Sequence, residues 1–200
     1  MTGFPAVEIE DTLPLYRATI KGYGPWWFGF DLNQRFDIPK PKGTCYLATT
    51  VETAFREKAR ETLLHTGMVS PAFVDKMEFY ELRLPATIQA ADTTSEKAVT
   101  FGANRELATV APPYEVPCAW AAALAGEGYG GVAYTSRFTS GVQWNALALF
   151  GDAEEAKWGH VNKWSGRIGL VDASLRHLIQ DHPPMSAVPL AVAPPPLKKK

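Results

Sequence analysis

Short runs of β-forming residues bounded by turn signals predict several strands along the chain. The first run covers Leu15–Ile20, and the second covers residues 44–49. The same signals predict further strands at residues 77–84, 131–134, 144–150 and 168–171. Residues 87–104 fit neither a helix nor a strand pattern, so we leave them unassigned.

The segment after the second strand predicts an amphipathic helix. Its start, Thr49-Thr50-Val51-Glu52, reads as a capping box, and the helix runs to about residue 64 or 65. On a helical wheel, Glu57 lies nearly opposite the apolar arc, so the pattern alone predicts a solvent-facing carboxylate. Glu52 lies at the edge of the arc, where the capping box is its simplest role. The apolar arc itself consists of Val51, Ala54, Phe55, Ala59 and Leu63.

Two more helices complete the predicted elements. Pro117 at a first helical position begins a short buried helix that Gly126 closes. Asp172 can cap a last helix that runs to about residue 179. Because strands and helices interleave with long irregular connections, the pattern indicates an α+β fold.

The chain length fits one domain with a short tail. The 200 residues amount to 21.9 kDa, and 46% of them are hydrophobic, which excludes wholesale disorder. We assign residues 1–182 to the domain. Residues 183–200 hold six of the 16 prolines and end in three lysines, so we expect a disordered tail.

Charge and hydropathy exclude several classes of protein. The formal net charge is −1, and the terminal lysines supply part of the positive charge, so the body is acidic. This argues against a dedicated nucleic-acid binder. The longest apolar run is roughly half of a membrane-spanning helix. The N-terminus lacks a signal-peptide pattern, so we expect a cytoplasmic protein without a membrane partner.

Several sequence motifs do not carry chemistry. Gly126–Gly131 matches GxGxxG as a string, but it follows a helix and precedes a strand, the reverse of a dinucleotide-binding turn. The four histidines lack metal-ligand spacing, so we expect no metal site. Cys45 and Cys118 read as small buried apolar residues, although pairing of either with a histidine as a nucleophile stays open.

A long segment without regular structure stands out between the first two strands. Residues 22–43 are rich in Gly, Pro and aromatic side chains, and loops of this length are usually functional. Trp26, Trp27 and Phe28 fit two interpretations equally well. They form a wall over a ligand, or they plug the edge of the domain.

Three segments together resemble the RES family, which is named for its Arg, Glu and Ser. The first is the strand that contains Arg17, in LYRA. The second is QRFDIPKPKGTCYLATTVETAFRE, which contains Arg35, Gly43, Tyr46 and Glu57. The third is GGVAYTSRFTSG, with Tyr134, Ser136 and Arg137, ahead of the apolar strand NALALF. The order and spacing of these motifs resemble the family over residues 13–152.

The resemblance implies a fold and a substrate. RES proteins have a fold like that of ADP-ribosylating toxins, with a mixed β-sheet core and flanking helices. Several are toxins of toxin–antitoxin pairs that destroy NAD by phosphorolysis or hydrolysis. One type of member instead transfers ADP-ribose to a protein. We therefore expect NAD as substrate, phosphate as a co-substrate of phosphorolysis, no other cofactor, and an antitoxin or immunity protein as partner.

The resemblance also implies roles for individual residues. Glu57, eleven positions after Tyr46, would be the catalytic carboxylate, and Ser136 would orient the substrate beside it. Arg17 and Arg35 would hold the phosphates, and Tyr46 would pack on the nicotinamide. The predicted catalytic set is Glu57, Arg35 and Ser136, and the predicted NAD-binding set is Arg17, Tyr46, Trp27 and Arg137.

These residue types suit the chemistry. Loss of nicotinamide leaves an oxocarbenium-like ribose, which a nearby carboxylate stabilises. Guanidinium groups fork onto the oxygens of a pyrophosphate, and an aromatic face suits a flat cationic ring.

Simpler interpretations stand beside these. Arg17 could be an edge-strand residue, Tyr46 a core residue and Ser136 a turn residue. At the level of function, a protein-modifying ADP-ribosyltransferase and a non-catalytic binding domain are the alternatives. A homodimer is also compatible with the sequence.

Overall fold

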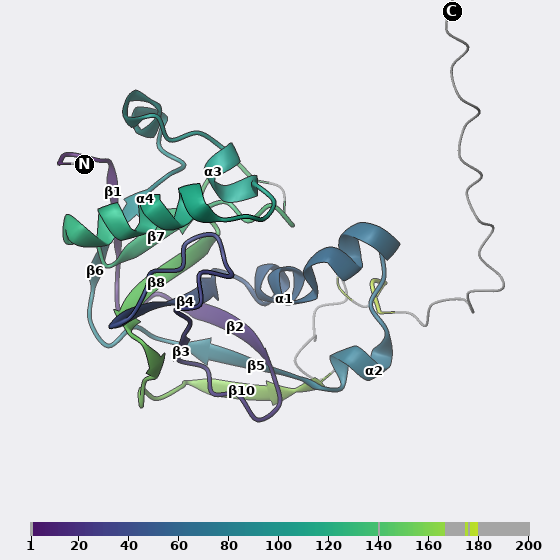
Figure 1. The fold of residues 1–200 in the computed structure, drawn as a ribbon. Coiled ribbons are helices and arrows are strands. Elements are labelled where there is room, and N and C mark those ends of the chain that lie inside the picture. Colours follow the sequence, from purple (N-terminus) through teal and green to yellow (C-terminus); the bar gives the residue numbers. More distant parts are fainter. Residues whose placement is uncertain (1, 140, 167–174, 176, 180–200) are drawn as a thin grey trace, which may run out of the picture.

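In the computed structural model, which describes residues 2–139, 141–166, 175 and 177–179, eight strands form one sheet (Figure 1). All neighbouring strands are antiparallel except β6 and β7, which run parallel. The sheet is therefore mixed. In spatial order the strands are β1 (Ala6–Ile9), β6 (Ile88–Asp92), β7 (Gly131–Tyr134), β8 (Ala146–Asp152), β4 (Lys42–Ala48), β2 (Leu15–Ile20), β5 (Met77–Leu82) and β10 (Asn162–Ser165).

The two longer helices cover one face of this sheet. Helix α1 (Val51–Thr66) packs on β2 and β5, and helix α4 (Glu115–Gly126) packs on β7 and β8. Figure 1 shows α4 above one half of the sheet and α1 beside β2. Shorter helical segments are α2 (Pro71–Val74), α3 (Glu106–Thr109) and the 3-10 turn Glu96–Phe101.

The other face is covered by the aromatic loop that precedes β4. Trp26 and Phe28 are fully buried there against Leu47, Leu147 and Leu149. Within this loop, β3 (Trp27–Phe28) pairs with β9 (Glu154–Glu155) in a small second sheet. The long segment of residues 22–43, between β2 and β4, is thus a packed layer of the domain.

Helix α1 begins one residue later than the sequence pattern predicts. Thr50 is the N-cap, and its hydroxyl accepts a hydrogen bond from the Thr53 backbone N–H. Glu52 therefore lies too early in the helix for the capping box predicted for it, and its carboxylate pairs with Arg56 at 2.9 Å. The predicted apolar arc is confirmed, since Ala54, Phe55 and Ala59 are buried and Val51 and Leu63 are partly buried.

Most of the other predicted elements are also present. The α+β class is confirmed, and the strands predicted at residues 15–20, 44–49, 77–84 and 131–134 lie within a few residues of their observed bounds. Helix α4 begins two residues before Pro117, because Tyr114 is its N-cap. The sequence pattern missed β1, β3, β9 and β10, and β6 lies in the residues that it left unassigned. The strand predicted at residues 168–171, the Asp172 cap and the tail from residue 183 lie outside the described residues.

The sheet opens between β2 and β4. These neighbouring strands pair at a single position, Tyr16 with Ala48, whereas β4 pairs with β8 at seven positions. Beyond that one pair the two strands diverge, and α1 lies over the opening. Among the described residues, no helix is long and apolar enough to cross a membrane.

The close approach of β4 to the aromatic loop yields a test of this packing. A Cβ at Gly43 would lie 2.7 Å from the Phe28 carbonyl oxygen and 2.9 Å from that of Gly29. We expect Gly43→Ala to lower the free energy of unfolding by roughly 1–3 kcal/mol, because backbone atoms must move apart. Gly126→Ala is the control, since no atom lies within 4 Å of a Cβ there, and it is expected to stabilise slightly. Urea unfolding of both variants measures the difference, and equal stabilities would contradict the packing.

Candidate active site

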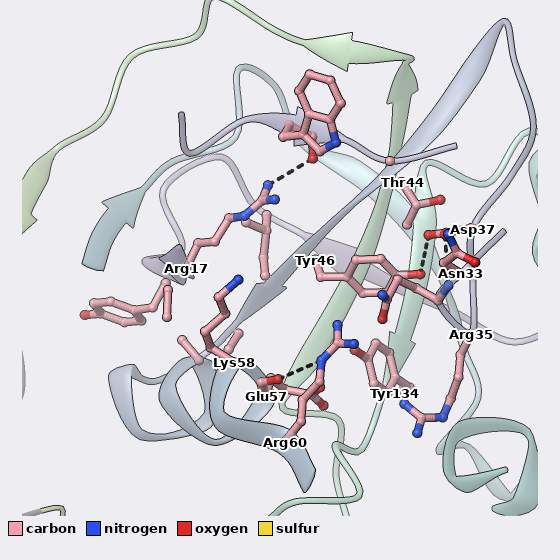
Figure 2. Close-up of a pocket in the computed structure, with 18 of the residues that line it drawn as sticks. Arg17, Asn33, Arg35, Asp37, Thr44, Tyr46, Glu57, Lys58, Arg60 and Tyr134 are labelled. Carbon is pink, nitrogen blue, oxygen red and sulfur yellow. Dashed lines mark hydrogen bonds between the residues drawn. The ribbon is translucent and has the colours of Figure 1, made fainter. Parts of the chain in front are cut away.

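A cavity of about 340 Å³ lies where β2 and β4 diverge. Strands β2 and β4 form two of its walls, α1 forms a third, and residues 29–37 of the loop before β4 form the fourth. Figure 2 shows the charged and aromatic side chains that point into it. Those that bear on its chemistry are Arg17, Trp27, Arg35, Asp37, Tyr46, Glu57, Lys58, Arg60 and Tyr134.

Glu57 presents a carboxylate to this cavity. Ala54, Glu57 and Lys58 lie on one side of α1 at the i, i+3 and i+4 spacing, and all three line the cavity. The Glu57 side chain is half-buried, and its Oε1 is buried with no hydrogen-bond partner among the described residues. A buried carboxylate oxygen without a partner is costly, which is typical of a group that serves a ligand.

Four cationic side chains line the same cavity. Besides Arg17 and Arg35, these are Lys58 and Arg60, which follow Glu57 on α1. Burial, followed by the charges of Arg60 and Arg17, lowers the pKa of Lys58. Burial and the nearby Arg137 likewise lower the pKa of Arg35. Crowded, partly desolvated cations favour an anionic ligand, because its charge offsets their repulsion.

Arg60 breaks the regular course of α1. Its φ of 41° and ψ of −123° are non-helical, and its Nε donates to the Glu57 carbonyl oxygen at 3.1 Å. A left-handed φ at a non-glycine residue is strained, and such strain concentrates at functional sites. Figure 2 shows the Arg60 side chain between Glu57 and Tyr134.

Arg17 holds the aromatic loop against the sheet. Its Nη1 donates to the carbonyl oxygens of Pro25 at 2.8 Å and Trp27 at 3.1 Å, and lies 2.6 Å from Cys45 Sγ. One edge of the guanidinium is therefore committed to the protein. Nε and Nη2 donate no hydrogen bond within the described residues, so this half of the fork faces the cavity without a protein acceptor.

Tyr46 offers the face of its ring while its hydroxyl is anchored. The hydroxyl donates to Asp37 Oδ1 at 2.9 Å and accepts from the Phe36 N–H at 3.0 Å (Figure 2). Burial raises the pKa of this hydroxyl well above its ordinary value, and the Asp37 charge adds to the shift. Burial also raises the pKa of Asp37, which is 2% exposed. The ring is thus held at a fixed tilt in the cavity wall.

Tyr134 closes the cavity beside the carboxylate. Its side chain is 3% exposed and lies at the end of β7. Burial raises the pKa of its hydroxyl well above the ordinary value, with the Glu57 charge as the next cause, whereas Arg35 and Arg60 act in the opposite direction. Tyr134 is therefore a neutral hydroxyl within the electrostatic reach of Glu57.

Comparison with known proteins identifies the family. Residues 14–165 match the RES domain. The chain belongs to the RES family. A similar solved structure is the crystal structure of the M. tuberculosis MbcT–MbcA toxin–antitoxin complex, with a TM-score of 0.61 and 11% identity over 80% of this chain and 86% of that chain. At this identity the likeness establishes a shared fold. No curated protein matches the chain.

The cavity between β2 and β4, which we call the RES cavity, brings together five of the seven residues predicted for the site. Arg17, Trp27, Arg35, Tyr46 and Glu57 all line it, although they come from four different elements and the loop. The wheel places Glu57 toward solvent, whereas in the structure it lies next to Ala54 on the flank of α1 that lines the cavity. The chemical roles of these residues stay predictions.

The remaining two predicted residues, Ser136 and Arg137, lie behind this RES cavity. Both line a neighbouring cavity of about 540 Å³. Ser136 Oγ accepts from the Phe138 N–H at 3.2 Å, and the Ser136 N–H donates to Asn145 Oδ1 at 2.8 Å. These bonds stabilise the turn after β7. Arg137 acts on the main cavity through its charge, which lowers the Arg35 pKa.

The aromatic triplet divides between its two predicted roles. Trp26 and Phe28 plug the core, while Trp27, at 41% exposure, lines the RES cavity. The period of two along an extended chain explains this division. Sequence reasoning missed Lys58, Arg60 and Tyr134. The i, i+4 spacing from Ala54 to Lys58 and the presence of Tyr134 in the third motif were the available signals.

The cysteines do not form an exposed nucleophile in this RES chain. Cys45 is fully buried and Cys118 is 8% exposed, and burial raises the pKa of both thiols. A raised pKa disfavours the reactive thiolate. Within the described residues, no group of three His, Cys, Asp or Glu side chains is arranged to hold a metal ion.

The anchored Tyr46 hydroxyl predicts a pH-dependent loss of stability. Its bond to Asp37 favours the ionised carboxylate, so it contributes most above the raised pKa of Asp37. We expect Tyr46→Phe to lower the free energy of unfolding by roughly 1–3 kcal/mol at neutral pH, and by less in acid where Asp37 is protonated. Denaturant unfolding at both pH values measures this. Tyr16→Phe is the matched control, because the Tyr16 hydroxyl makes no hydrogen bond to the described residues; an equal loss for both variants would contradict the anchoring.

Proposed function

We propose that this RES protein is a toxin-type enzyme that breaks the nicotinamide–ribose bond of NAD. The observation that carries the proposal is the unpartnered, buried Oε1 of Glu57 in a cavity lined by four cations and the Tyr46 ring. A dinucleotide contains all three matching parts: an anionic pyrophosphate, a flat cationic ring and a sugar whose bond to that ring can ionise.

Glu57 is the group that stabilises the reacting sugar. When the bond between ribose C1 and the nicotinamide nitrogen breaks, its electron pair leaves with nicotinamide, and positive charge develops on the ribose. A carboxylate held beside C1 stabilises this charge, most effectively in a site screened from water. Because Oε1 accepts no hydrogen bond from the described residues, this oxygen and its share of the carboxylate charge are available to the sugar.

The cations and aromatic groups hold the rest of the substrate. Arg35, Lys58 and Arg60 face the phosphate oxygens, and Tyr46 and Trp27 supply ring faces for nicotinamide. The edge of the Arg17 guanidinium that makes no hydrogen bond to the described residues adds a second pair of N–H donors for the phosphate oxygens. This arrangement requires neither a metal ion nor a further cofactor.

The group that captures the ribose defines the product. Attack at C1 by phosphate yields ADP-ribose 1-phosphate, attack by water yields ADP-ribose and a proton, and attack by a protein side chain yields a modified protein. We propose phosphorolysis or hydrolysis, in the cytoplasm. The similar M. tuberculosis structure is a toxin–antitoxin complex, which supports an antitoxin partner for this chain as well.

Loss of the Glu57 charge tests the proposal directly. We expect Glu57→Gln to lower kcat for nicotinamide release about 100-fold or more, because the charge that stabilises the sugar is lost at constant shape. Glu52→Gln is the matched control, since Glu52 lies on the same helix, pairs with Arg56 and does not line the cavity. It is expected to stay within about twofold of the wild type.

Chromatography of the products, with and without phosphate, is the measurement. ADP-ribose 1-phosphate identifies a phosphorylase, and ADP-ribose identifies a glycohydrolase. Intact NAD under both conditions would contradict the proposal and favour a binding domain. Labelled protein after incubation with labelled NAD and lysate would instead identify an ADP-ribosyltransferase.

Substitution of Arg35 tests the proposed binding of the NAD phosphates. Arg35→Lys keeps the charge but removes the forked donors, so we expect KM for NAD to rise about tenfold with little change in kcat. Arg56→Lys is the control, because Arg56 does not line the cavity. Steady-state kinetics separates the two parameters, and an unchanged KM in Arg35→Lys would remove Arg35 from the phosphate site.

A further inference from the structure

A second hollow adjoins the proposed active site. It measures about 690 Å³ and lies between the loop that contains Leu32 and the start of α4. Its surface is mostly apolar, and its lining includes Pro112, Pro113, Tyr114 and the small side chains of Ala119 and Ala122. We call it the α4 groove. Its size falls in the range of small-molecule sites.

The α4 groove adjoins the active-site cavity. Asn33 lines both hollows. Arg35 stands at the junction: it lines the cavity, its Nε donates to the Val110 carbonyl oxygen at 3.1 Å, and its guanidinium carbon lies 5.3 Å from the centre of the Tyr114 ring. Cys118 Sγ donates to the Gln34 carbonyl oxygen at 3.3 Å, which ties α4 to the loop between the hollows.

The order of chemistry along the two hollows matches a dinucleotide. Glu57 and the Tyr46 ring lie at one end, the Arg35 guanidinium lies in the middle, and an apolar groove with a Tyr ring and two prolines lies at the other end. NAD has the same order, with nicotinamide riboside, pyrophosphate and adenosine. A purine suits the groove because it is flat and apolar on its faces, while the Asn33 amide and the Glu115 carboxylate supply hydrogen-bonding groups for its edge.

We infer that the α4 groove binds the adenylate half of NAD. The inference rests on the proposed function for the identity of the substrate and adds the position of its second base. It also assigns a role to Arg35, which would hold the pyrophosphate at the junction between the two halves.

A substitution that fills the α4 groove tests the inference. Ala119 and Ala122 are exposed residues that line the groove, and Ala123 is an exposed neighbour on α4 that does not. A tryptophan at position 122 would occupy the space of the purine. The probes are AMP, which carries only the adenylate half, and nicotinamide mononucleotide, which carries only the other half. NMR titration measures the dissociation constant of each probe for the wild type, Ala122→Trp and Ala123→Trp.

We expect Ala122→Trp to weaken AMP binding at least tenfold while nicotinamide mononucleotide binding stays within twofold, and Ala123→Trp to change neither. AMP that fails to bind the wild type, or that binds Ala122→Trp as well as the wild type, would overturn the inference. Should Ala122→Trp unfold, as judged by circular dichroism, Ala119→Trp repeats the test from the same wall.

Cleavage of NAD is measured separately, so the two proposals fail independently. A protein that binds AMP in an Ala122-sensitive manner but leaves NAD intact would retain the groove and lose the proposed function. A protein that degrades NAD with an unchanged KM in Ala122→Trp would retain the function and lose the groove.

Discussion

The single paired position between β2 and β4 is the constraint on which the site depends. Antiparallel neighbours normally continue their ladder, and here the ladder stops after Tyr16 and Ala48. The unpaired stretch leaves a gap in the middle of an otherwise continuous eight-stranded sheet of described residues. Side chains from both strands, from α1 and from the loop before β4 converge there. Without this divergence, Glu57 would face solvent above a closed sheet.

Hydrogen bonds from charged and polar groups join both strands beside the gap to the aromatic loop. Arg17 links β2 to the aromatic loop, and the pair of Tyr46 and Asp37 links β4 to the same loop from the other side. Both sets use backbone or buried partners, whose loss leaves unsatisfied groups. The loop is therefore structural as well as part of the site, which explains why such a long irregular segment is so well packed.

Local sequence signals predicted most of the helices and strands. They did not predict which side chains from distant elements meet in the cavity. The apolar arc of α1 follows from short-range spacing. The cap does not, since the N-cap is Thr50 and the predicted capping box began at Thr49, and the alternation that buries Trp26 and Phe28 around Trp27 became clear only once the loop was seen to be extended. Whether Glu57 faces bulk water or a cavity depends on what lies across from it, and a helical wheel carries no information on that. Lys58 was missed for the same reason. Ser136 fits a motif, but its hydroxyl is used in its own turn.

One face of helix α1 packs in the core, and another lines the cavity. Phe55 and Ala59 anchor the helix in the core, and Glu57 stands between them in sequence on the opposite side. The backbone that carries these residues is one stiff segment up to the kink at Arg60. Any repacking of the core beneath the helix therefore also moves the Glu57 carboxylate relative to the cavity, so the same few core side chains set both the packing of α1 and the position of this acidic group.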